Sequence, residues 1–164
     1  MSEIKKRTAK AEIISTILQY DADGNSVLDD RERTSDGPVQ SAETTTLTTD
    51  CIVSEQDNSI EIQYDESEIT GMEGSTTRIC FDKNDPTLVS LLREGEVSTA
   101  LVFEAGRRHF CVYETPYFPI ELCVNTLHMN NAITFDGGTL TAEYLVEMGG
   151  VLTEKTNLKL SILN

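Results

Sequence analysis

Short segments in which apolar and polar residues alternate follow one another through most of the chain. The clearest covers residues 60–65, where Ile60, Ile62 and Tyr64 alternate with polar neighbours. Successive side chains of a β-strand point to opposite faces, so this period of two predicts strands with one buried face. The same period recurs in residues 99–103, 120–126, 140–147 and 158–162.

Turn signals separate these segments and lead to a count of about ten strands. They include residues 71–74, 82–86, Ala105–Gly106, Asn130–Asn131 and 136–138. Many short strands joined by short polar turns are typical of a sandwich or a barrel, and consecutive hairpins favour an up-and-down meander. Closure removes exposed strand edges. We therefore predict an all-β antiparallel meander closed into a barrel of about 8–10 strands.

Two segments fit this alternation poorly. Residues 11–20 alternate imperfectly, as a strand does, but their isoleucines also fit the 3.6-residue period of a helix, so both readings stay open. Residues 21–40 are rich in Asp, Gly, Ser and Pro and hold few aliphatic side chains. They predict a long, flexible acidic loop within one domain that spans residues 1–164.

Charge and cysteine usage narrow the classes of partner. The chain has 28 acidic and 13 basic residues and a net charge of −15, which disfavours nucleic acid and anionic membranes as partners. Its basic start is not followed by the apolar stretch of a signal peptide, which predicts a cytoplasmic protein. None of the four cysteines forms a C-x-x-C pair, so we expect reduced thiols and no zinc or redox motif.

Five short blocks in fixed order carry a resemblance to a known family. They are Tyr64-Asp65-Glu66, Gly71-Met72-Glu73-Gly74, Arg93-Glu94-Gly95, Val102-Phe103-Glu104 and Tyr113-Glu114-Thr115-Pro116-Tyr117. In these blocks the chain resembles the YwiB-like family of uncharacterised bacterial proteins over about its last hundred residues. The resemblance implies a calycin-like, or lipocalin-like, β-barrel. It implies no activity.

Tyr64 and Glu66 continue the face that Ile60 and Ile62 occupy, so we predict that both point into the barrel. A carboxylate buried there needs a partner, for which several Arg and His residues are candidates. Such a group could orient a small polar ligand. The alternative, which we favour, is a structural polar network near the end of the barrel. The candidate ligand-binding residues are Tyr64, Glu66, Glu73, Arg78, Arg93, His109 and Tyr113.

Two further motifs carry weaker functional signals. Pro116, Tyr117 and Phe118 form a proline–aromatic rim at a strand end that could contact a partner or a second copy, although a rigid turn with packed rings explains them more simply. Residues 21–30 resemble a calcium loop, but their spacing does not match an EF-hand. The sequence therefore assigns no metal, cofactor or catalytic residue.

Three functions remain open, and we rank them. A barrel that binds a small molecule comes first, and a protein-interaction or oligomerisation module comes second. An enzyme that uses Glu66, Glu73 or His109 as an acid or base comes last, because no known catalytic motif is present.

Overall fold

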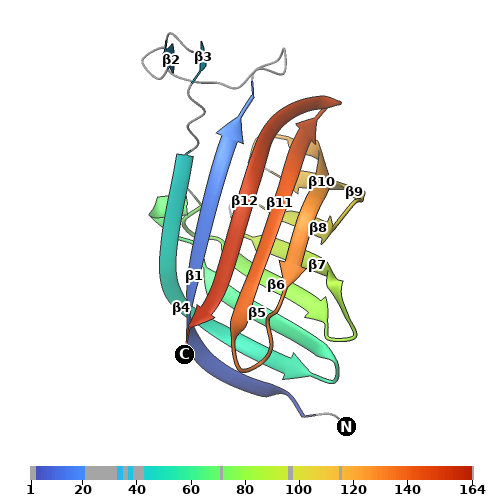
Figure 1. Cartoon of the computed structure of the whole chain (residues 1–164). Helices are drawn as coiled ribbons and strands as arrows, with labels where there is room; N and C mark the ends of the chain where they lie inside the picture. The colour runs from blue at the N-terminus through green and yellow to red at the C-terminus, as the bar shows by residue number, and fades with distance from the viewer. Residues whose placement is uncertain are drawn as a thin grey trace.

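Ten antiparallel strands form one sheet that curls into a nearly closed barrel (Figure 1). A computed structural model describes residues 3–20, 33–34, 37–38, 43–70, 72–95, 98–114 and 116–163. The barrel strands are β1 (Lys5–Gln19), β4 (Glu43–Gln56), β5 (Ser59–Asp65), β6 (Thr76–Asp82), β7 (Asp85–Glu94), β8 (Thr99–Glu104), β9 (Arg108–Glu114), β10 (Pro119–Asn131), β11 (Gly138–Met148) and β12 (Val151–Leu163). A separate two-stranded ladder contains β2 (Arg33–Thr34) and β3 (Gly37–Pro38), and a 3₁₀ helix, η2, spans Glu68–Thr70.

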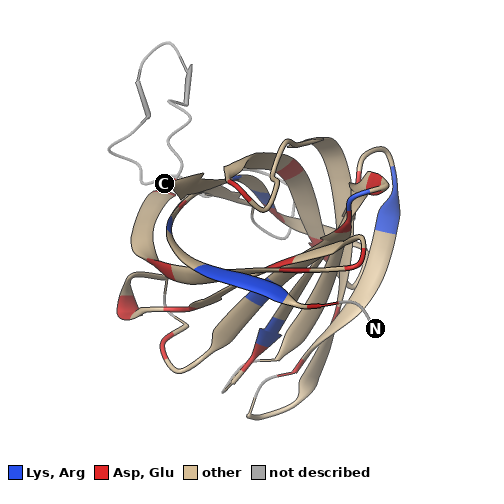
Figure 2. Cartoon of the chain, turned by 90° about the horizontal axis from the view of Figure 1, so that it is seen from below, with Lys and Arg blue, Asp and Glu red and all other residues tan. Residues whose placement is uncertain are grey.

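The strands follow one another around the barrel in chain order. Figure 2 shows the barrel from below. The first barrel strand, β1, pairs with β4 on one side and with the last strand, β12, on the other. Ile13 of β1 therefore lies opposite both Leu47 and Leu160. The predicted up-and-down meander is therefore confirmed. The ambiguous segment 11–20 is mostly strand β1, since β-branched residues on a half-buried surface pack well between two partner strands.

The seam between β8 and β9 is the incomplete part of the ring. Ser98 and Glu114 exchange two backbone hydrogen bonds of 3.1 and 2.8 Å, and the amide of Arg107 donates to the carbonyl of Glu104 at 3.0 Å. Between these two points β8 and β9 form no ladder, although the structure describes every residue from 98 to 114. The amide of Gly106 instead donates to Thr126 of β10 at 2.8 Å, which holds the turn in place.

The inward faces of the strands form one apolar core. Ile62, Tyr64, Tyr144 and Leu160 are all buried in it, and Leu122 packs against it, as the alternation predicts. The rings of Phe103 and Tyr144 lie 4.7 Å apart across the interior.

Arg7 helps to close the end of the barrel where β1 begins. Its Nε donates to the carbonyl of Phe135, in the β10–β11 connection, at 2.6 Å, and its guanidinium lies 5.6 Å from the Phe135 ring centroid. A planar cation over an aromatic face is stabilised by the ring quadrupole. These two contacts tie the start of β1 to the β10–β11 connection.

One predicted turn is wrong. Asn130 and Asn131 belong to β10, and the chain turns between Thr134 and Gly137, which exchange backbone hydrogen bonds of 2.8 and 3.1 Å. The Asn131 side chain explains the difference, since it donates to the carbonyl of Pro86 at 3.2 Å and accepts from the amide of Ile133 at 3.1 Å. The predicted loop 21–40 lies almost entirely outside the described residues, and the calcium-like segment 21–30 lies wholly outside them.

The four cysteines are free thiols, as expected. Burial raises the pKa of each one, to about 11 in Cys80. A thiol with a raised pKa is a poor nucleophile at neutral pH. Cys51 lies in the apolar core and Cys111 packs against it. No helix in the described ranges has the length and apolarity that a membrane crossing requires.

Candidate ligand-binding site

A cavity of about 490 Å³ lies inside the barrel at the end where β1 finishes and β4 begins. We call the open end of this cavity the mouth. Larger side chains at the inward-facing positions here would fill the space. These positions instead carry the short polar side chains of Ser15, Thr45, Thr99 and Thr156. The remaining walls are mainly aliphatic, with Leu91, Leu101, Leu122, Val124 and Leu158 among them.

A buried polar network stands on one wall. Glu66 follows β5, and its Oε1 accepts a 2.6 Å hydrogen bond from Thr77 Oγ1 and lies 3.4 Å from Arg93 Nη2. Arg93 Nε also donates to Thr77 Oγ1 at 3.2 Å. The Glu66 and Arg93 side chains are only 2% and 13% exposed. A charge removed from water to this degree is tolerated because it has both an opposite charge and hydrogen bonds.

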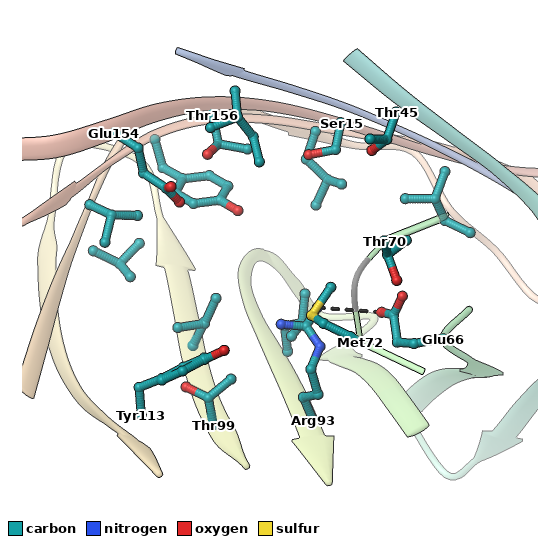
Figure 3. Close-up of a pocket in the computed structure, with 18 of the residues that line it drawn as sticks. Ser15, Thr45, Glu66, Thr70, Met72, Arg93, Thr99, Tyr113, Glu154 and Thr156 are labelled. Atoms are coloured by element: carbon teal, nitrogen blue, oxygen red, sulfur yellow. Dashed lines mark hydrogen bonds and ion pairs between the residues drawn. The ribbon is translucent and has the colours of Figure 1, made fainter. Parts of the chain in front are cut away.

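Two glycines let the neighbouring connections approach each other beside this network. Gly95, at the end of β7, has φ +153°, and a Cβ there would lie 2.6 Å from the carbonyl oxygen of Gly74. Gly74 itself has φ +88°, and the amide of Ser75 donates to the carbonyl of Met72 at 3.1 Å, so residues 72–75 form a turn. Gly71, the first residue of the predicted turn signal, lies outside the described residues. The close approach places Met72 in the cavity lining beside Glu66 and Arg93 (Figure 3).

A second carboxylate, Glu154, lies across the cavity from Arg93 (Figure 3). Burial raises its pKa above the usual range. Burial, with the Glu154 charge as the second cause, also raises the pKa of Tyr144 to about 12, so this phenol keeps its proton at neutral pH. Thr156 has Glu154 and Tyr144 as polar neighbours, yet its Oγ1 makes no hydrogen bond of good geometry in the described part of the chain.

The structure brings four of the seven sequence-predicted residues together. Tyr64, Glu66, Arg93 and Tyr113 all line the cavity, where burial and then the Glu66 charge raise the pKa of Tyr64.

The other three predicted residues lie elsewhere. Glu73 is exposed on its turn, and Arg78 Nε lies 3.9 Å from Glu61 Oε1 in a half-buried pair at the barrel surface. His109 Nε2 lies 3.0 Å from Glu104 Oε1, and neither residue lines the cavity. The candidate acid–base groups Glu66, Glu73 and His109 therefore do not share a site.

Sequence reasoning missed the wall made by β12. It placed Leu158, Leu160 and Ile162 on one face but did not extend the alternation backwards. Continuing the period of two adds Thr156 and Glu154 to that face, and the structure places both in the cavity lining. The sequence signal that could have found this wall is the presence of polar side chains, Glu154 and Thr156, at inward positions of a strand whose other inward side chains are apolar.

The predicted rim lies between β9 and β10 and is exposed. Tyr117 and Phe118 are 89% and 63% exposed, and Phe110 on the outside of β9 is 71% exposed. Within the described residues, no three His, Cys, Asp or Glu side chains gather as they would around a metal ion.

Comparison with known proteins identifies the fold and the family. The crystal structure of the ywiB protein from Bacillus subtilis matches with a TM-score of 0.65 and 15% identity, over 96% of this chain and 94% of that one. At this identity the likeness shows the shared barrel fold. No curated protein sequence matches the chain. Residues 31–160 match the family described as a domain of unknown function, DUF1934, and this span is well over half of the sequence. The chain therefore belongs to the DUF1934, YwiB-like family.

Proposed function

We propose that this barrel binds a small, largely apolar molecule in the cavity at its mouth. The observation that supports this function is the cavity itself, whose volume of about 490 Å³ lies within the usual range for ligand sites. Aliphatic walls with a few polar groups at defined positions are also typical of such sites. The calycin-like architecture that the sequence suggests fits a binding role, and the free thiols fit a cytoplasmic location.

The Glu66 network belongs to the frame of this site. Its Oε1 atom is engaged by Thr77 and Arg93, which commits this side chain to contacts within the protein. We assign ligand contact to the aliphatic walls and to the polar groups that remain, above all Glu154, Thr99 and Thr156. Acid–base catalysis has less support, since Glu73 and His109 do not line the cavity.

A fluorescent probe tests the binding function directly. N-phenyl-1-naphthylamine is uncharged at pH 7 and fluoresces more strongly in apolar surroundings, so its fluorescence should rise and saturate with this protein. Leu101→Trp and Leu122→Trp, which add volume inside the cavity, should each lower probe affinity at least tenfold. Ile52→Trp, on the exposed outside of β4, is the matched control and should bind as the unaltered protein does. Circular dichroism checks that each variant folds, and normal binding by both filled variants would refute the function.

Self-association is a second candidate function, favoured by exposed apolar side chains beside the open seam. Phe110 and Val112 lie on the outside of β9, next to the rim of Pro116, Tyr117 and Phe118. Contiguous exposed apolar surface of this kind is typical of contact between protein copies. Sedimentation velocity at rising concentration should show a dimer that Phe110→Ser weakens and Leu88→Ser, on β7, does not. A monomer at all concentrations would exclude this function.

A further inference from the structure

The charged side chains that line the cavity are unbalanced. Four carboxylates, Glu43, Glu66, Glu68 and Glu154, face one guanidinium, Arg93. Because Arg93 is paired with Glu66, three carboxylates of the lining have no cation within ion-pairing distance in the part of the chain that the structure describes. Such a site repels anions and attracts cations.

Glu154 is the unpaired carboxylate that is partly removed from water. It stands on β12 across the cavity from the Glu66–Arg93 pair (Figure 3), whereas Glu43 and Glu68 are exposed. A partly buried carboxylate with no cation pays a desolvation cost that an incoming cation would offset.

Two buried hydroxyls in this cavity make no hydrogen bond of good geometry within the described residues. Thr156 is 2% exposed and Thr99 is 7% exposed. Glu154 and Tyr144 lie near the Thr156 hydroxyl and Cys111 lies near that of Thr99, but neither Oγ1 atom makes a hydrogen bond of good geometry within the described residues. Buried polar groups are nearly always hydrogen-bonded to protein, water or ligand. Thr156 shares the inward face of β12 with Glu154, so a group that donates to Glu154 lies within reach of its hydroxyl as well.

We propose that the cavity selects amphipathic cations, namely primary amines whose ammonium group binds at Glu154 beside Thr156 while the hydrocarbon part lies against the aliphatic walls. This inference rests on the proposed binding function and specifies its ligand class. An ammonium group has three donors and no acceptor, which matches a carboxylate with a neighbouring hydroxyl. Glu43 and Glu68 at the mouth add long-range attraction. A carboxylate ligand finds no available cation, because Glu66 and Thr77 hold Arg93.

Three ligands with the same alkyl chain test the inference: octylamine, octanol and octanoate. Each displaces N-phenyl-1-naphthylamine from the protein at pH 7.4, at concentrations below aggregation. We expect octylamine to displace the dye at a concentration at least tenfold lower than octanol does, and octanoate to be weakest. Glu154→Gln should bring octylamine to within threefold of octanol and leave octanol unchanged. Glu121→Gln removes the same charge from the outside of β10 and should keep the full preference for the amine.

The outcomes separate this inference from the function on which it rests. If neither the dye nor octanol binds the unaltered protein, the binding function fails. If octanol binds and octylamine binds no better, or if Glu154→Gln retains the tenfold preference, the cation inference is overturned and the binding function stands. Glu154→Met is a second variant without the charge, so loss of folding by one substitution does not remove the test; thermal melts followed by circular dichroism verify both.

Discussion

Glu66 is a buried carboxylate, and its charge is tolerated in the barrel only because neighbouring side chains pair with it. Its partners come from two different strands, Thr77 on β6 and Arg93 on β7, so the network ties the end of β5 to both. A buried ion pair adds little net stability compared with a well-packed apolar pair, but removing one partner leaves an uncompensated charge. The network therefore fixes the geometry of one cavity wall.

Arg93→Met should destabilise the protein by about 3 kcal/mol, because it leaves the Glu66 charge buried and unpaired. Equilibrium unfolding in urea measures the change. The double variant Glu66→Gln with Arg93→Met should recover most of the loss. Arg78→Met, which disturbs a long, partly exposed surface pair with Glu61, should cost less than about 1 kcal/mol. Equal losses for Arg93→Met and Arg78→Met would contradict the assigned role.

The pH dependence of protein stability should show the raised pKa of Glu154. Because burial raises its pKa, the folded protein binds this proton more tightly than the unfolded chain does. Its ionisation therefore removes stability as the pH rises from the usual glutamate pKa of about 4.3 through the raised value. Glu154→Gln should be more stable than the unaltered protein at pH 7, and the difference should shrink towards pH 4. A difference independent of pH, or one equal to that of Glu121→Gln, would contradict the prediction.

Among the structural elements, the open seam between β8 and β9 gives a prediction for backbone exchange. Residues of a strand direct their N–H groups alternately to its two sides, and the amide of Glu114 points to β8. The amides of Phe110 and Val112 therefore face the part of the seam without a ladder, while Cys111 and Tyr113 face β10. Hydrogen exchange followed by NMR should show much faster exchange at Phe110 and Val112. Equal protection of all four amides would mean that β8 and β9 pair along their length and close the barrel.

The strands were predictable where one face is apolar and the other polar. β5 and β11 follow from alternation alone, since a shift of one residue would expose every buried side chain. β1 was ambiguous because consecutive isoleucines satisfy both periods, and the choice depends on pairing with β4 and β12, which are distant in sequence. The cavity was harder to predict from the sequence. Tyr64 and Glu66 lie on a face that the alternation predicts to point inward, but β5 and β12 line the same cavity only because the sheet curls into a barrel.

At the scale of the whole molecule, the chain forms a nearly closed barrel while it carries a large excess of negative charge. Acidic positions lie all round the barrel in Figure 2. Exposed ion pairs such as Lys10–Asp50 and Lys155–Glu143 offset part of the repulsion, but pairs of this kind contribute between about 0 and 1 kcal/mol each. The chain carries 28 acidic and 13 basic residues, and folding brings those on the barrel strands into a compact volume. The repulsion is therefore greater in the folded protein than in the expanded unfolded chain.

Salt should consequently stabilise this protein. The Debye length falls from about 30 Å at 0.01 M salt to about 10 Å at 0.1 M, which is shorter than the width of a domain this size. Because the net charge is −15 and exposed pairs contribute little, we expect the relief of repulsion to exceed the loss from weakened surface pairs. The melting temperature should rise between 0.01 and 0.3 M NaCl, and KCl should give the same shift because the effect depends on ionic strength. A melting temperature that falls with salt would mean that the surface ion pairs outweigh the repulsion.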